Sequence, residues 1–259
     1  MMKRRTMLYF GSFNPVHKGH IALAEYVLRE GLCDMVALVV SPQNPHKVQR
    51  TLLPELTRFE MAEKACAESE YPMQIQPSAV EFLLEKPSYT INTLRFLEEN
   101  NGRDSEFSIL MGADNLETLD TWREAETIME NYKIYVYPRE GCATESRHPN
   151  ITFLTDAPMF DCSSTEIRNA LRKGRDVSEW LSDGVRDYIA ANGLFPCMES
   201  QTEPLMAAGV EHYRRNEWGA ALNKFRGVLE LNPDDTEARE YVRMIEEILA
   251  FRYTDIYNP

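Results

Sequence analysis

The chain has 259 residues, of which 43% are hydrophobic, and a formal net charge of -13 at pH 7. This composition is typical of a folded globular protein and excludes a disordered one. The length is enough for one large domain or two smaller ones. The acidic balance argues against a broad nucleic-acid-binding surface, because such surfaces are basic. It leaves room for a nucleotide, which needs only a few local donors.

The cysteines and the apolar runs indicate where the protein works. Five cysteines, at positions 33, 66, 142, 162 and 197, are scattered without a CxxC pair. This odd number fits a reducing cytoplasm better than a disulfide framework, and the cysteine spacing offers no zinc site. The apolar run at residues 7–10 is too short for a signal sequence, and no run of about 18 apolar residues follows. We therefore expect a soluble, cytoplasmic protein that contacts neither membrane nor nucleic acid.

Strand patterns and helix patterns alternate along the first 198 residues. Apolar runs predict strands at residues 7–10, 35–40, 73–76, 107–111, 134–136 and 151–154. Helical spacing predicts helices at residues 21–30, 56–67, 88–97, where hydroxyl groups would cap the start, and 124–131. This alternation predicts an α/β fold with a doubly wound parallel sheet. Ligands of such sheets bind at the carboxyl ends of the strands, near the switch in strand order.

From about residue 199 the pattern becomes wholly helical. The sequence thus predicts two domains, residues 1–198 and a small all-α appendage at residues 199–259. The spacing of Gly209, Trp218, Ala221, Phe225 and Pro233 resembles one tetratricopeptide repeat, and a further helix is expected at residues 236–252. A single repeat cannot bury both of its faces. We therefore expect the tail to dock on the first domain, on a second subunit or on a protein partner, with a plain helical hairpin as the alternative.

Residues 7–20, MLYFGSFNPVHKGH, place two histidines at a junction of strand, turn and helix. On a first helical turn, the spacing of His17 and His20 puts both imidazoles on one side, near free backbone N–H groups. Those groups and the helix dipole favour an anion, and the imidazoles add donors. The pattern favours a triphosphate as the ligand. Two ordinary surface histidines beside a Gly-Pro turn are the alternative.

A second motif, CSSTEIR at residues 162–168, indicates the start of another helix. Ser163 and Glu166 have the spacing of a capping box. Hydroxyl and N–H groups at such a helix start can also hold phosphate oxygens, and Arg168 is near enough to add a charge-assisted contact.

The two motifs together resemble the HxGH and SSTxIR signatures of the nucleotidylyltransferase superfamily. One departure is Phe10, which stands where such families usually carry a second glycine. Three further stretches resemble the bacterial nicotinate-nucleotide adenylyltransferases, namely SPQNPHK at residues 41–47, SYTINT at 88–93 and MGADN at 111–115, followed by Trp122. The resemblance covers residues 7 to about 196 and leaves the helical tail out.

This resemblance implies a Rossmann-like sheet and an enzyme that joins ATP to nicotinate mononucleotide, giving deamido-NAD and pyrophosphate, with Mg2+ as the ion that accompanies ATP. It implies catalytic roles for His17, His20, Lys47 and Arg168. It implies ATP contacts at Gly11, Ser12, Phe13, His17, His20, Gly112, Asp114, Ser163, Thr165 and Arg168. It implies substrate contacts at Lys47 for the phosphate, Thr90 for the nicotinate carboxylate and Trp122 for the pyridine ring. A solvated loop lysine and a core tryptophan remain the alternatives at Lys47 and Trp122.

Three other functions stay open. A pantetheine-phosphate adenylyltransferase is disfavoured, because those proteins typically carry Thr where His17 stands and are shorter. A preference for nicotinamide over nicotinate mononucleotide is the second. The third is an inactive nucleotide-binding protein whose tail recruits a partner. The sequence also leaves a homo-oligomer open.

Overall fold

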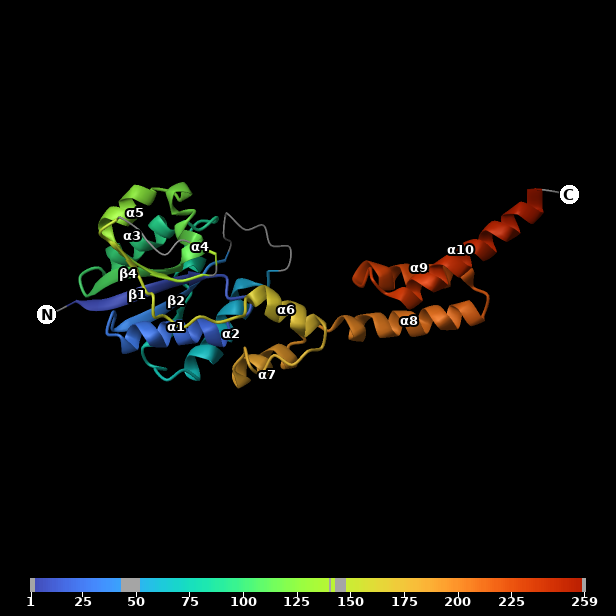
Figure 1. Cartoon of the computed structure of the whole chain (residues 1–259), viewed down its shortest axis with the longest axis horizontal. Helices are drawn as coiled ribbons and strands as arrows, with labels where there is room; N and C mark the ends of the chain where they lie inside the picture. Colours follow the sequence, from blue (N-terminus) through green and yellow to red (C-terminus); the bar gives the residue numbers. More distant parts are fainter. Residues whose placement is uncertain (1–2, 43–51, 140, 143–147, 258–259) are drawn as a thin grey trace. The chain divides into compact units, whose positions relative to one another are not determined.

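The computed structural model describes the chain apart from residues 1–2, 43–51, 140, 143–147 and 258–259 (Figure 1). The described part contains a six-stranded, fully parallel sheet with the order β3-β2-β1-β4-β5-β6. The strands are β1 (Arg4–Gly11), β2 (Met35–Val40), β3 (Ile75–Ser78), β4 (Ser105–Gly112), β5 (Lys133–Tyr137) and β6 (Ile151–Phe153). The predicted α/β class with a parallel sheet is therefore confirmed.

Helices cover both faces of this sheet (Figure 1). One face carries α1 (Lys18–Arg29) and α2 (Glu55–Ala67), and the other carries α3 (Thr90–Asn101), α4 (Ala113–Leu116) and α5 (Ala125–Asn131). The remaining elements of this region are η1 (Val80–Leu83), η2 (Leu119–Thr121), α6 (Ser164–Arg172) and α7 (Asp183–Ala191). Among the helices of the described residues, none has the length and apolar character that crossing a lipid bilayer requires.

The central strands are apolar throughout because helices cover both of their faces. Met7, Leu8 and Tyr9 of β1 are all buried, although their side chains alternate between the two faces. On the α3 side of the sheet, Ile91 and Leu94 of this helix join one continuous core with residues of β1, β4 and β5. This double burial is the reason why periodicity of two is missing from the strand sequences.

The order of the strands places a binding edge beside β1. β1 pairs with β2 on one side and with β4 on the other, so the strand order switches between β1 and β4. Gly11, Val40 and Gly112, the last residues of these three strands, therefore lie along one edge of the sheet. Ligands bind at this position in doubly wound sheets.

Two helix starts differ from the expectation. α1 begins at Lys18 rather than at residue 21, so that His17 is its N-cap. α3 begins at Thr90 with Tyr89 as N-cap, and no side chain caps it. The predicted hydroxyl cap near residue 88 is thus wrong, because an extended Tyr89 begins the helix and its side chain makes no capping bond.

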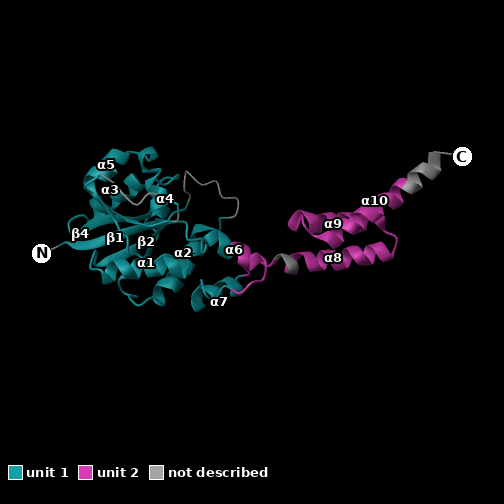
Figure 2. Ribbon diagram, viewed as in Figure 1, with its two compact units in different colours: residues 1–167, 177–192 teal, residues 168–176, 193–259 magenta. Residues whose placement is uncertain are grey.

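The chain divides into two compact units, residues 1–167 with 177–192, and residues 168–176 with 193–259 (Figure 2). The second unit contains the helical tail, with α8 (Met198–Arg214), α9 (Trp218–Leu231) and α10 (Thr236–Tyr257). These units differ from the predicted division into residues 1–198 and 199–259, because residues 168–176 and 193–198 group with the tail.

An aromatic stack holds the tail helices together. Phe225 of α9 is fully buried and stacks on Tyr241 of α10, with ring centroids 4.5 Å apart and planes 3° from parallel. Tyr213 of α8 meets both Tyr241 and Trp218 edge to face. A Cβ on Gly209 of α8 would lie 2.7 Å from the Phe225 ring. The predicted tetratricopeptide-like spacing thus brings a glycine under an aromatic ring, which lets two helices approach closely.

Candidate active site

The turn after β1 is shaped by Phe13, which the sequence analysis assigned to ATP. Its φ of 45° lies in the left-handed region, which few non-glycine residues adopt. Its ring is buried and lies where a Cβ on Gly11 would come within 2.8 Å. The glycine at position 11 therefore accommodates Phe13. The predicted close approach of ATP to the Gly11 backbone stays a prediction, and the inward direction of the ring leaves only the Phe13 backbone for such a ligand.

His17 and His20 lie together at the start of α1, as predicted. Their ring centroids are 3.7 Å apart, and the N–H of His17 donates to Nδ1 of His20 at 3.1 Å. Because Nδ1 accepts this bond, the neutral His20 ring carries its proton on Nε2. The backbone thereby sets the tautomer and leaves the Nε2–H as a donor.

Both imidazoles are held neutral near pH 7. Burial lowers the pKa of His17 to about 4, and the positive charge of Arg139 adds to this. Burial also lowers the pKa of His20 well below the usual range, with His17 and Arg139 as further causes. The histidines of the free protein are therefore hydrogen-bond donors rather than cations.

A polar network lies beside the histidines at the ends of β1, β4 and β5. Tyr9 and Tyr137 are hydrogen-bonded through their hydroxyls at 3.1 Å, and Arg139 donates to the Tyr137 hydroxyl at 3.4 Å. Arg139 also forms an ion pair with Asp114 at 3.8 Å. The carboxylate of Asp114 lies where a Cβ on Gly112 would be, only 2.3 Å away. Gly112 thus makes room for Asp114, and the predicted contact of Asp114 with ATP stays a prediction.

The predicted capping box at the start of α6 is confirmed. Glu166 accepts the N–H of Ser163 at 2.7 Å and its hydroxyl at 2.8 Å, and the N–H of Glu166 donates back to Ser163 at 3.2 Å. The hydroxyl of Ser164 donates to the carbonyl of Pro15 at 2.9 Å, which ties α6 to the turn before His17. A phosphate at Ser163 would have to replace Glu166 as the partner of that hydroxyl.

The other predicted phosphate ligands lie on the same helix. Thr165 is on the first turn of α6, and Arg168 follows one turn later, within the second unit. Burial and the neighbouring Arg172 lower the pKa of Arg168 from its usual value. The contacts of Thr165 and Arg168 with a phosphate stay predictions. Lys47 lies outside the described residues, so its predicted role stays a prediction.

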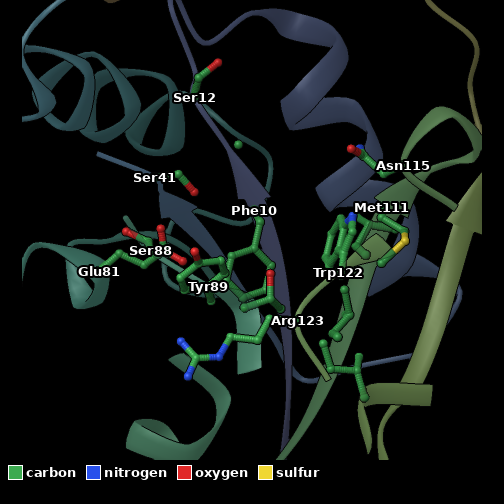
Figure 3. Close-up of a pocket in the computed structure, with 15 residues that line it drawn as sticks. Phe10, Ser12, Ser41, Glu81, Ser88, Tyr89, Met111, Asn115, Trp122 and Arg123 are labelled. Atoms are coloured by element: carbon green, nitrogen blue, oxygen red, sulfur yellow. The ribbon is translucent and has the colours of Figure 1, made fainter. Parts of the chain in front are cut away.

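A pocket opens beside β1 on the side of β4 and α3 (Figure 3). It brings together four residues that the sequence analysis singled out, and they are Gly11, Ser12, Thr90 and Trp122. Phe10, the departure from the family pattern, also lines it. The pocket is also lined by Ser41, Ser88, Tyr89 and Asn115, which stand in the three family-like stretches but were given no role there. Glu81 and Arg123 line it as well and lie outside those stretches.

Glu81 is the most informative of the residues that were missed. It is only 2% exposed and accepts a hydrogen bond from the hydroxyl of Thr93 at 3.0 Å. Burial raises its pKa, against the opposing effect of the hydroxyls of Ser41, Thr93 and Ser88. Figure 3 shows Glu81, Ser88 and Ser41 gathered at one wall of the pocket. A lone carboxylate inside the apolar run AVEFLL was the signal in the sequence that could have identified it.

The described residues offer no metal-binding cluster. No three His, Cys, Asp or Glu side chains within the described ranges are arranged to hold an ion.

The fold and the site define a nucleotide-binding α/β domain of the doubly wound type. A model of the cytidylyltransferase-like family matches residues 8–170. Among relatives, a protein of Flavobacterium johnsoniae is 41% identical over 192 residues, which are 73% of this chain and 97% of the relative. A protein of Christiangramia forsetii is 38% identical over 192 residues, 73% of this chain and 96% of the relative. Both carry the name "probable nicotinate-nucleotide adenylyltransferase".

The fold is also similar to a solved structure, the Plasmodium falciparum nicotinic acid mononucleotide adenylyltransferase complexed with APC. The TM-score is 0.64 at 18% identity, over 74% of this chain and 97% of that chain. At this identity the likeness concerns the fold. Together with the relatives it accounts for the sheet and its helices but leaves about a quarter of this chain unmatched. The chain belongs to the cytidylyltransferase-like family and, within it, to the nicotinate-nucleotide adenylyltransferases.

Proposed function

We propose that the protein transfers the adenylyl group of ATP to nicotinate mononucleotide, forming deamido-NAD and pyrophosphate. The observation that carries this proposal is the identity of 41% to a relative of that name over 97% of its length. The site supports it independently. A pair of neutral histidines at a helix start and a pocket lined by Trp122 and Thr90 lie beside the same strand, where an adenylyl donor and an aromatic mononucleotide can meet.

The reaction needs no covalent enzyme intermediate. An oxygen of the mononucleotide phosphate attacks the α-phosphorus of ATP, a new P–O bond forms, and the bond to the β-phosphate breaks so that pyrophosphate leaves. A phosphate monoester is already an adequate nucleophile near neutral pH. The protein therefore contributes positioning and charge stabilisation along an in-line path.

Each predicted residue then has a place in this proposal. The Nε2–H of His20 donates to an oxygen of the α-phosphate, and His17 donates to a neighbouring phosphate oxygen. Thr165 and Arg168, with Ser163 once it is released from Glu166, hold the β- and γ-phosphates. Thr90 and the start of α3 receive the nicotinate carboxylate, and Trp122 stacks on the pyridine ring. Lys47 pairs with the phosphate of the mononucleotide.

Mg2+ belongs to the proposal as the partner of ATP. It usually reaches such sites on the substrate phosphates and needs few protein ligands. When bound, it would neutralise charge on the pyrophosphate.

The five cysteines are all free thiols, which supports a cytoplasmic location. Homo-oligomer formation and a protein contact of the tail remain part of the proposal.

The decisive experiment measures pyrophosphate release from ATP with nicotinate and nicotinamide mononucleotide in parallel, at equal concentrations. We expect turnover with nicotinate mononucleotide and a lower kcat/KM with its amide. A higher kcat/KM with the amide would assign the nicotinamide preference instead. No release with either mononucleotide would favour the inactive nucleotide-binding protein.

A further inference from the structure

The most deeply buried cation of the described residues is Arg58, on the first turns of α2. Its side chain is 0% exposed and is the largest among the fully buried ones. Burial lowers its pKa to about 10, with Glu55 opposing, so it stays charged at neutral pH. A buried charge is costly unless it is well bonded. Its position therefore calls for an explanation beyond packing.

No carboxylate of the described residues forms an ion pair with Arg58. Glu55, the acidic neighbour that acts on its pKa, is paired with Lys86 at 2.7 Å. The guanidinium instead donates to backbone carbonyls. Nε donates to Leu53 at 2.9 Å, one terminal nitrogen to Ser12 at 2.6 Å and Ser41 at 2.8 Å, and the other to Pro42 at 3.2 Å. One side chain thus fixes four carbonyls, because the planar guanidinium presents five donors.

These carbonyls belong to the segments that shape the pocket beside β1. Ser12 follows β1 and Ser41 follows β2, and both line the pocket. The two segments are also joined directly, since the N–H of Ser41 donates to the carbonyl of Gly11 at 2.9 Å. Leu53 adds a third segment, which leads into α2. The backbone N–H of Leu53 also donates to the side-chain oxygen of Asn14 at 3.3 Å.

We propose that Arg58 is a positioning residue for the reaction, because its guanidinium holds the segments after β1 and β2 at the spacing that the mononucleotide pocket requires. The inference rests on the proposed function for the identity of the ligand. Arg58 touches no substrate itself. Its contribution is pre-organisation, and a shift of about 1 Å in such a wall can cost on the order of a hundredfold in rate.

The test compares Arg58→Lys and Arg58→Met with the wild-type protein. Lysine keeps the charge but has a single nitrogen for the four carbonyls, and methionine keeps the volume without any donor. We expect both variants to lose at least tenfold in kcat/KM for the mononucleotide, with a larger rise in its KM than in that of ATP. The matched control is Met61→Val, which shortens a fully buried side chain of the same helix and should lower the melting temperature with kcat/KM unchanged.

Amide hydrogen exchange gives a second readout that does not depend on activity. The Ser41 N–H should exchange faster in Arg58→Lys than in the wild type, and at the wild-type rate in Met61→Val. The inference is overturned if folded Arg58→Lys keeps kcat/KM within twofold, or if Ser41 exchange is unchanged. A wild-type protein that is inactive with both mononucleotides would refute the proposed function instead, and the exchange measurement would then decide the role of Arg58. If Arg58→Met does not fold, Arg58→Lys decides.

Discussion

At the scale of single residues, the site depends on histidines that are donors without being charged. His20 accepts a backbone N–H at Nδ1, so a second proton there would break this bond. Burial disfavours the same proton. A neutral imidazole with a fixed Nε2–H can donate a hydrogen bond at neutral pH, and in the proposed reaction it would donate to a phosphate oxygen from a fixed position.

The first prediction concerns this donor. His20→Ala should lower kcat for pyrophosphate release on the order of a hundredfold, because one preorganised donor to the reacting phosphate is lost. Steady-state kinetics with saturating ATP measures it. His212→Ala is the matched control, since His212 is a histidine of the tail paired with Glu217. Near wild-type turnover of His20→Ala would contradict the assigned role.

The second prediction concerns pH and stability. The pKa of His17 is about 4 in the folded protein and near 6.5 in the unfolded one, so the unfolded state binds more protons between these values. The contribution of His17 to the free energy of unfolding is therefore fully present above pH 6.5 and is lost as the pH falls toward 4. It amounts to about 3 kcal/mol. Denaturant unfolding of the wild type and His17→Gln across this range measures it.

The difference between the two proteins isolates His17 from Glu81. The pKa of Glu81 is raised by burial, so its contribution has the opposite sign and is lost as the pH rises. The Glu81 contribution occurs in both proteins and therefore cancels in the difference between their free energies of unfolding. Equal pH slopes for the wild type and His17→Gln would show that His17 is not held neutral by the fold.

At the scale of elements, sequence reasoning was most accurate where one cause dominates. The run MVALVV is the strand β2 with the expected bounds, because a strand covered on both faces is apolar throughout. The start of helix α3 was less predictable, because Tyr89 is its N-cap and no side chain makes a capping hydrogen bond there. Glu81 was missed because it lies on a short 3-10 helix, which has no periodicity long enough to recognise. The inward ring of Phe13 depends on a backbone angle that the residue type disfavours.

The third prediction concerns the contact between α8 and α9. Gly209→Ala should destabilise the tail, although alanine favours helices, because its Cβ would lie 2.7 Å from a Phe225 ring stacked on Tyr241. Gly227→Ala is the matched control inside α9, where the nearest atom would be 3.6 Å away. It should raise the stability by about 0.5–1 kcal/mol. Thermal unfolding of the full chain compares them, and a higher melting temperature for Gly209→Ala would contradict the stated contact.

At the scale of the whole molecule, the chain combines a family domain with a helical tail. The Flavobacterium johnsoniae relative is matched over 97% of its length by 73% of this chain, so about a quarter of this chain has no counterpart in that relative. Sequence motifs predicted this part well, because strand ends and helix starts carry them. They could not predict what the tail binds, since its pattern is explained by its own core.

The fourth prediction follows from this division. Deletion of residues 199–259 should leave kcat/KM for pyrophosphate release within about twofold, and size-exclusion chromatography will report whether the oligomeric state changes. An unchanged oligomeric state would leave partner recruitment as the role of the tail. A loss of more than tenfold in kcat/KM, in a variant that is still folded, would contradict the prediction.

The position of β1 in the sheet has a consequence for synthesis. Among the strands of this sheet, β1 is translated first although it is a central one, and its partner on one side is β4, with Arg4 opposite Ser105. Until translation has passed this point, one edge of an apolar strand has no partner to pair with. Such an edge is prone to aggregation. The nascent chain is therefore most vulnerable while the residues between β1 and β4 are translated, and chaperone dependence should be concentrated in that interval.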